Sequence, residues 1–337
     1  MDNENNSTTQ IILKSIIFSM GFFIIAQLLS FGFTNDKNSY TRISAYELQQ
    51  EDEIDYLWLG ASRVYRGIDP EILDCSLNAL TFNAGSSSQR PEDSYFRLKE
   101  ILKHHHVEKV VYDINYIMFQ DYPGDSTIRT HIFLDYMPFG INKLQYAYEV
   151  LGKPEYGITT ISNIVRYKEA WKDSKKVLQN IRMHLLDSSY KECDYSKAKT
   201  GDEWYDGKGF VYSTRVYESG DYLQVPWSRE DLYPLQLEYL QKMVSLCKEY
   251  GCELLFISLP VYPDYLEREP NYADIYDYFL TFSEKNEIEY VDLNQITMSE
   301  LGLTKESFQD EMHLNGKGAE EISRYLAGYL SAREGKE

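Results

Sequence analysis

Residue types that together perform nucleophilic catalysis occur far apart in this 337-residue chain. Near the C-terminus, the stretch SFQDEMHLNGKG places Asp310 three residues before His313. A carboxylate close to a histidine can orient the imidazole as a general base. Near the N-terminus, Ser62 ends the short apolar run YLWLGAS, among small residues that leave its hydroxyl group accessible. We therefore take Ser62, His313 and Asp310 as the candidate nucleophile, base and orienting carboxylate.

Apolar runs alternate with stretches of helical periodicity, and this alternation must position the three residues. The predicted strands cover residues 56–62, 77–85, 107–116, 252–260 and 288–294. Between them lie predicted helices that follow Pro91, Tyr233 and Tyr272, and a last helix covers about 317–332. This order predicts an α/β domain with a parallel sheet of about five strands.

The carboxyl ends of parallel strands share one edge of a sheet, where functional residues gather. The first predicted strand ends at Ser62, the second at Gly85 and the third at Asn115. The backbone N–H groups of Ser62 and Gly85, with the Asn115 amide, are candidate donors for an oxyanion. A helix cap at Ser62, a turn glycine and a capping asparagine are the structural alternatives.

These blocks, in this order, resemble those of the SGNH, or GDSL-like, serine hydrolase superfamily. They read LGASRVYRGIDP, FNAGSSSQ, YDINY and DEMHLNGKG, and the resemblance covers roughly residues 55–330. It implies a three-layer α/β/α, flavodoxin-like fold and a Ser-His-Asp triad. The first block has Ala where the superfamily has Asp, and the third lacks its Gly-x-Asn-Asp pattern. Asp113 and Asn83 are therefore alternatives to Asn115 at the site.

The N-terminal region predicts a membrane anchor. No charged residue occurs from Ser15 to Phe33, a length that nearly matches the ~30 Å bilayer core. A cleaved signal peptide is the main rival. We predict a cytoplasmic segment (1–14), a transmembrane signal anchor (15–34), a polar tether (35–54) and a hydrolase-like domain (55–332). An insertion at about 119–234 breaks the alternation and is expected to cover or shape the site.

An anchor followed by such a domain resembles the membrane-attached SGNH-like proteins of bacterial surface-polymer modification, in alginate O-acetylation and teichoic-acid D-alanylation. The resemblance implies a single-pass cell-membrane protein with an extracytoplasmic domain. It also implies an esterase or O-acyltransferase acting on acyl esters of a cell-surface or extracellular polysaccharide, beside a membrane-bound O-acyltransferase. A non-catalytic polymer-binding or accessory subunit is the alternative, and a lipid or small-ester hydrolase is a third.

Composition restricts the partners. A net charge of −19 argues against nucleic acid, because phosphate binding needs clustered Lys and Arg. The 30 tyrosines suit core packing or a sugar-facing surface. Arg63 and Arg66 follow Ser62 and are candidate contacts for an anionic sugar, with surface ion pairing as the alternative. We expect no cofactor and no metal, and we interpret the run His104–His106 as a turn rather than a metal site.

Overall fold

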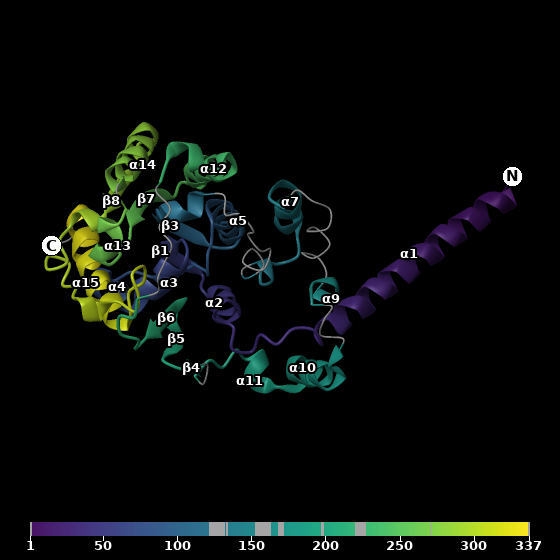
Figure 1. Ribbon diagram of the computed structural model, residues 1–337. Helices are drawn as coiled ribbons and strands as arrows, with labels where there is room; N and C mark the ends of the chain where they lie inside the picture. Colours follow the sequence, from purple (N-terminus) through teal and green to yellow (C-terminus); the bar gives the residue numbers. More distant parts are fainter. Residues whose placement is uncertain are drawn as a thin grey trace. The chain divides into compact units, whose positions relative to one another are not determined.

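The computed structural model of the chain (Figure 1) is divided into two compact units. The first comprises Met1–Lys37 and Ala147–Asp194, and the second comprises Asn38–Tyr146 and Tyr195–Glu337. The structure describes residues 2–120, 132, 134–151, 163–167, 172–196, 199–219, 227–269 and 271–335.

The second unit contains a five-stranded sheet in the order β2-β1-β3-β7-β8. All four strand pairings are parallel, which confirms the predicted parallel sheet. The strands are β1 (Glu53–Leu59), β2 (Thr81–Asn83), β3 (His106–Asp113), β7 (Glu253–Ser258) and β8 (Glu289–Asp292). The first strand, β1, lies between β2 on one side and β3 on the other, and the later strands β7 and β8 extend the sheet beyond β3. This is the strand order of one group of doubly wound folds. The carboxyl ends of β1, β2 and β3 consequently lie side by side.

Helices cover both faces of the sheet. Successive β1 side chains point to opposite faces, so Leu57 belongs to one buried cluster and Trp58 to the other. The first cluster is closed by α5 (Pro91–Ile101), α12 (Pro234–Tyr250) and α14 (Tyr272–Asn286). The second is closed by α3 (Ser62–Gly67), α4 (Pro70–Leu77) and α15 (Gly316–Arg333). The unit therefore has three layers: the sheet and a layer of helices on each of its faces.

The segment predicted as a polar tether contains a helix, α2 (Tyr40–Leu48). Ser39 caps it by accepting a hydrogen bond from the backbone N–H of Arg42 at 3.4 Å. Ile43 is 1% exposed and Leu48 belongs to the core cluster of the sheet unit. The segment expected as a tether thus contains a helix whose apolar side chains Ile43 and Leu48 are buried.

Part of the predicted insertion joins the same unit as a small antiparallel sheet. Its strands are β4 (Lys199–Thr200), β5 (Glu203–Gly207) and β6 (Phe210–Ser213). The β5–β6 turn lies against β2, since Asn83 N–H donates to the carbonyl of Lys208 at 2.9 Å. At Gly209, with φ of 80°, an added Cβ would lie 2.0 Å from the Asn83 carbonyl oxygen. Only glycine permits this approach.

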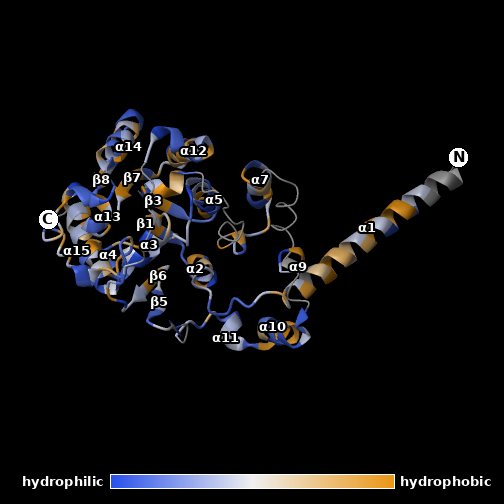
Figure 2. Cartoon of the chain, in the orientation of Figure 1, coloured by the Kyte–Doolittle hydropathy of each residue, from blue (hydrophilic) through white to orange (hydrophobic). Residues whose placement is uncertain are grey.

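The first unit contains α1 (Asp2–Ser30), α9 (Asn163–Arg166), α10 (Ser174–Leu186) and α11 (Ser188–Lys191). Within α1, the 19 residues Thr8–Ala26 are long and apolar enough to cross a membrane (Figure 2), and none of them is buried in the structure. The helix end is tied down where Asn180 donates to the Gly32 carbonyl at 2.9 Å.

Candidate active site

A tight turn after β1 positions Ser62. The strand ends at Leu59, and α3 begins at Ser62 itself, so the hydroxyl group lies at the carboxyl edge of the sheet. The turn requires glycine at Gly60, where φ is 151° and an added Cβ would lie 2.7 Å from Val64 Cγ2. The small residues before Ser62 therefore permit a sharp change from strand to helix.

The loop before α15 holds Asp310 and His313 in a fixed turn. Asp310 Oδ1 accepts hydrogen bonds from the backbone N–H groups of Met312 and His313, both at 2.9 Å. Gln309 N–H donates to the His313 carbonyl at 3.0 Å and closes the loop. Asn315 then caps α15 by accepting from Gly318 N–H at 3.1 Å. The DxxH spacing thus forms a carboxylate-centred turn that faces the imidazole.

The structure joins the three predicted residues in one chain of hydrogen bonds. Ser62 Oγ lies 2.7 Å from His313 Nε2, although the residues are 251 positions apart. His313 Nδ1 lies 2.8 Å and 3.0 Å from the two carboxylate oxygens of Asp310. A proton on Nδ1, as Asp310 favours, leaves Nε2 free to accept the Ser62 hydroxyl proton. The arrangement can generate a serine nucleophile.

The surroundings of Asp310 keep it ionised. Burial by itself would raise the pKa of this carboxyl group. The hydrogen bond and charge of His313, with the two backbone N–H groups, more than offset burial and hold the pKa below its ordinary value. The side chains of His313 and Asp310 are only 15% and 17% exposed, so their interaction is only partly screened by water. Asp310 is therefore a negative charge beside the ring near neutral pH.

Candidate oxyanion donors surround the same turn. The backbone N–H groups of Ser62 and Gly85 donate to no other residue among those described. Gly85 lies directly against the turn, because a Cβ there would come within 3.1 Å of the carbonyl oxygens of Gly60 and Ala61. Two free donors at one turn fit the stabilisation of a developing negative charge.

Asn115 is less closely connected to the turn. It is 3% exposed and lines a small cavity with Arg63 and Met312. Its Oδ1 is buried and has no hydrogen-bond partner in the described part of the chain. The alternatives are already engaged: Asp113 pairs with Arg63, and Asn83 donates to the Ile68 carbonyl at 2.8 Å. Asn115 stays the predicted third donor.

The close approach of Gly85 leads to a testable prediction. Gly85→Ala is expected to slow fluorophosphonate inactivation about tenfold, since the turn carrying Ser62 must move by a few tenths of an ångström. The second-order rate constant measures this. Gly328→Ala is the matched control, because a Cβ at Gly328 meets nothing within 4 Å. Equal rates for Gly85→Ala and wild type would remove Gly85 from the site.

The two arginines after Ser62 have protein partners. Arg63 is buried and forms a salt bridge with Asp113 at 2.6 Å. Arg66 pairs with Glu203 of β5 at 2.7 Å. Burial would lower the pKa of the Arg66 guanidinium, but its acidic and tyrosine neighbours raise it above the ordinary value. The structure thus uses both arginines in ion pairs, and the predicted sugar contacts have no support in its geometry.

A cavity beside Gly85 was not foreseen from the sequence. It has a volume of about 170 Å³, and we call it the Gly85 cavity. Its walls come from α2, from residues 85–87 and Tyr65, and from the β5–β6 hairpin. A sequence signal for this cavity does exist. The segments expected as a tether (35–54) and as an insertion (119–234) are rich in tyrosine, and each contributes a tyrosine, Tyr40 and Tyr205, to the cavity wall. Among the residues described, no group of three His, Cys, Asp or Glu residues is placed to hold a metal ion.

No protein-family model matches this chain, and no curated protein matches it.

Proposed function

We propose that the chain is a membrane-anchored serine esterase or O-acyltransferase of the SGNH type that acts on acyl esters of a bacterial surface or extracellular polysaccharide. The observation that carries the proposal is the continuous hydrogen-bonded chain from Ser62 through His313 to Asp310. A helix cap at Ser62 and a turn at Asp310 would not require the two to be joined through an imidazole. The parallel sheet and the free N–H groups at Ser62 and Gly85 agree with it.

The reaction would proceed in two steps. His313 Nε2 accepts the proton of the Ser62 hydroxyl group while Ser62 Oγ attacks the ester carbonyl carbon. The resulting oxyanion accepts hydrogen bonds from the Ser62 and Gly85 N–H groups, each worth roughly 3 kcal/mol. The tetrahedral intermediate then expels the alcohol, which takes the proton from His313 and leaves an acyl-serine. Water or a sugar hydroxyl group then attacks the acyl carbon while His313 Nε2 accepts its proton. The bond to Ser62 Oγ breaks, His313 returns the proton to Ser62, and the acid or the new ester leaves.

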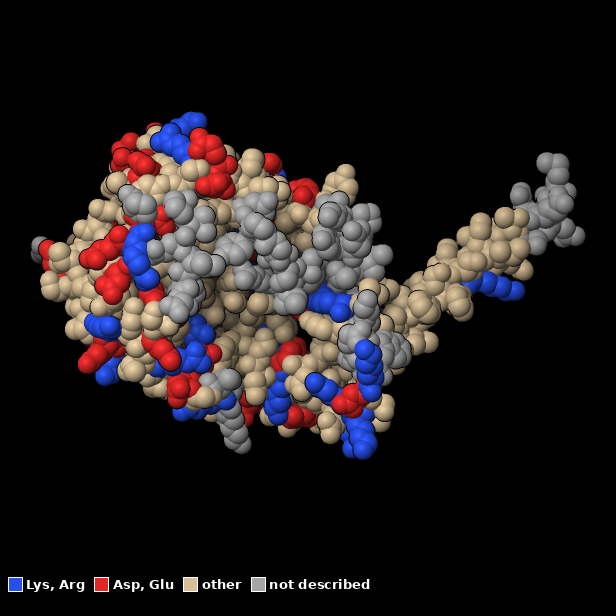
Figure 3. Space-filling model, viewed as in Figure 1, with Lys and Arg blue, Asp and Glu red and all other residues tan. Residues whose placement is uncertain are grey.

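The location and the acceptor follow from other features. The apolar stretch Thr8–Ala26 would hold the enzyme at the membrane, with the catalytic unit outside the cytoplasm. A net charge of −19, with acidic and basic side chains interspersed on the face shown in Figure 3, does not favour nucleic acid. Three tyrosines line the Gly85 cavity, Tyr40, Tyr65 and Tyr205, and aromatic rings suit the apolar face of a sugar.

Fluorophosphonate labelling of the full chain in neutral detergent tests the proposal. We expect labelling of the wild type and none of Ser62→Ala or His313→Ala, because the probe reacts only with an activated serine. Ser245→Ala, at an exposed serine on α12, is the control and should label normally. Absence of labelling in the folded wild type would reject the enzyme and leave the polymer-binding accessory subunit. With an acylated substrate, release of free acid or transfer to added oligosaccharide separates esterase from transferase.

A further inference from the structure

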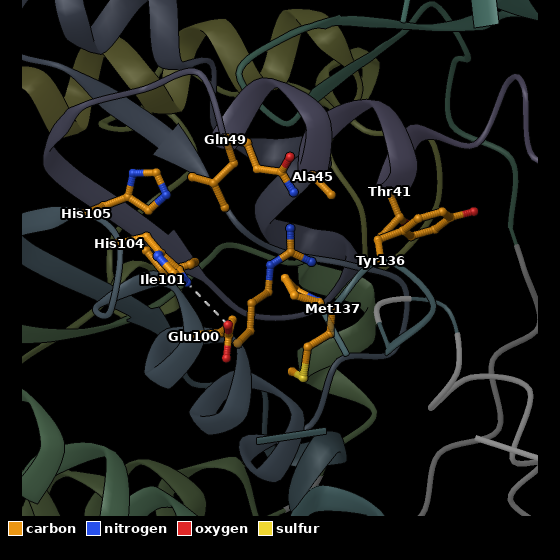
Figure 4. A pocket seen from close by; sticks show the side chains of 12 residues that line it. Thr41, Ala45, Gln49, Glu100, Ile101, His104, His105, Tyr136 and Met137 are labelled. Carbon is orange, nitrogen blue, oxygen red and sulfur yellow. Dashed lines mark ion pairs between the residues drawn. The ribbon is translucent and has the colours of Figure 1, made fainter. Parts of the chain in front are cut away.

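A second cavity is also lined by α2, and it has a basic residue in its wall. Its volume is about 90 Å³, and we call it the Arg97 cavity. Thr41, Ala45 and Gln49 approach it from α2, Ile101 and Glu100 from α5, and Tyr136 and Met137 from a later segment (Figure 4). Arg97 of α5 lines the same space. Most of the lining is apolar, so a charge here interacts strongly with its surroundings.

Arg97 has no protein partner in the described part of the chain. It is 8% exposed, and it makes no ion pair or hydrogen bond with any described residue. Glu100 lies one turn further along α5, but its carboxylate is bound by Asn142 at 2.6 Å and Lys103 at 3.0 Å. Burial lowers the pKa of the Arg97 guanidinium to about 10, so the group is still charged at neutral pH.

An unpaired buried guanidinium is unfavourable for folding. Its desolvation is not compensated, and an apolar side chain of similar length would fill the same space at lower free energy. The buried Arg63 and the partly buried Arg66 are, by comparison, both paired with carboxylates. The planar fork of a guanidinium matches a carboxylate or phosphate in a bidentate manner. Arg97 therefore has the properties of a residue whose partner is a ligand.

The Arg97 cavity and the Gly85 cavity have a wall residue in common. Thr41 lines both cavities. Tyr205, which lines the Gly85 cavity, is close enough to Arg97 to act against the lowering of the Arg97 pKa by burial. Ser44, also in that wall, has a buried hydroxyl group without a hydrogen-bond partner in the described chain. A ligand that spans both cavities would thus meet Gly85 in one of them and the Arg97 guanidinium in the other.

We propose that the Arg97 cavity binds an anionic group, a carboxylate or a phosphate, of the ligand that occupies the Gly85 cavity. Resting on the proposed function, this makes the substrate an acidic glycan, and Arg97 selects charged over neutral polymers. Arg97 is a binding residue in this scheme and takes no part in proton transfer.

Thermal unfolding of the full chain in neutral detergent tests the site without depending on catalysis. Sodium acetate and sodium phosphate are the probes, at ionic strength held constant with sodium chloride. At about ten times the half-saturating concentration, we expect a rise of about 3 °C in the Tm of wild type. We expect none in Arg97→Met. Arg324→Met, which removes an exposed arginine from α15, should respond like wild type.

The variants also separate a ligand site from a structural role. Without added anion, Arg97→Met should unfold at the same temperature as wild type or higher, because it removes an unpaired buried charge. Arg97→Lys keeps the charge but loses the fork and should respond more weakly. A response to acetate alone indicates a carboxylate, and a response to phosphate alone indicates a phosphate ester. Equal responses of wild type and Arg97→Met, or no response of wild type, would overturn the proposal.

Ser62→Ala distinguishes the two proposals from each other. It should keep the full response to anions while losing fluorophosphonate labelling. An anion response that requires Arg97, in a wild type that does not label, would support the anion site and reject the enzyme. Labelling that requires Ser62, with no anion response, would support the enzyme and reject the anion site.

Discussion

Replacing Asp310 by Asn is expected to slow fluorophosphonate inactivation by about 10³- to 10⁴-fold while leaving the fold intact. The Asn Oδ1 can still accept the backbone N–H groups of Met312 and His313 that now bind Asp310 Oδ1 at 2.9 Å. Its amide nitrogen would then donate toward His313 Nδ1. This favours the tautomer with a proton on Nε2, which cannot accept the proton of Ser62. The second-order rate constant and the hydrolysis of p-nitrophenyl acetate both measure the loss.

The matched control removes a carboxylate of the same loop region that lies outside the hydrogen-bonded chain. Glu306→Gln changes an exposed residue of the short 3-10 turn Lys305–Ser307 and should react within twofold of wild type. The melting temperature of Asp310→Asn should stay close to that of wild type, which separates catalysis from folding. A rate within tenfold of wild type would show that Asp310 does not orient His313, and the carboxylate would be structural.

Asp113→Asn is expected to lower the free energy of unfolding by about 3–5 kcal/mol, the usual effect of removing one partner of a buried ion pair. The Asp113 side chain is fully buried and accepts from Arg63 at 2.6 Å and 3.0 Å and from Leu259 N–H at 3.1 Å. Burial would lower the pKa of Arg63, but the charge and hydrogen bonds of Asp113 raise it above the ordinary value. An uncharged Asn would leave a buried guanidinium without its counter-ion.

Denaturant unfolding of the full chain in detergent measures this change. The exposed pair between Arg324 and Glu320 is the control, and Glu320→Gln should lower the free energy of unfolding by less than about 1 kcal/mol. The Arg63–Asp113 pair also links the ends of β3 and β7 next to Ser62, because Arg63 donates to the Ile114 and Leu259 carbonyls. Labelling should therefore weaken with the fold. An effect of Asp113→Asn below 1 kcal/mol would contradict the role of the pair.

The alternation of strands and helices could be predicted from the sequence because it depends on local patterns of residues. Buried strands such as LWL in β1 and LLFIS in β7 are short apolar runs, and the helices between them carry their own caps and periodicity. The contact between Asp310 and His313 is also local, since a turn of four residues fixes it. In contrast, α2 escaped prediction because its buried side chains, Ile43 and Leu48, do not form a continuous apolar stripe in a polar segment.

Partners distant in the chain could not be predicted from residue type. Arg63, Arg66 and Arg97 are the same residue in similar surroundings, and nothing local says which will be paired. The sheet order places Asp113 beside Arg63, and the β5 hairpin brings Glu203 to Arg66. Neither element pairs a carboxylate with Arg97 in the described part of the chain. The arginines predicted as sugar contacts, Arg63 and Arg66, are therefore not the arginine that lacks an ion pair.

The sequence by itself determined the alternating α/β architecture, the apolar N-terminal helix and the residue types of the candidate triad. The tertiary structure alone decided that Ser62 Oγ and His313 Nε2, 251 positions apart, lie 2.7 Å from each other. It also decided that, within the described residues, Arg63 is paired with a carboxylate and Arg97 lines a cavity without an ion pair. The physical reason is that periodicity and turns depend on neighbours in the chain. Charge pairing and cavities depend on which segments the packed sheet brings together.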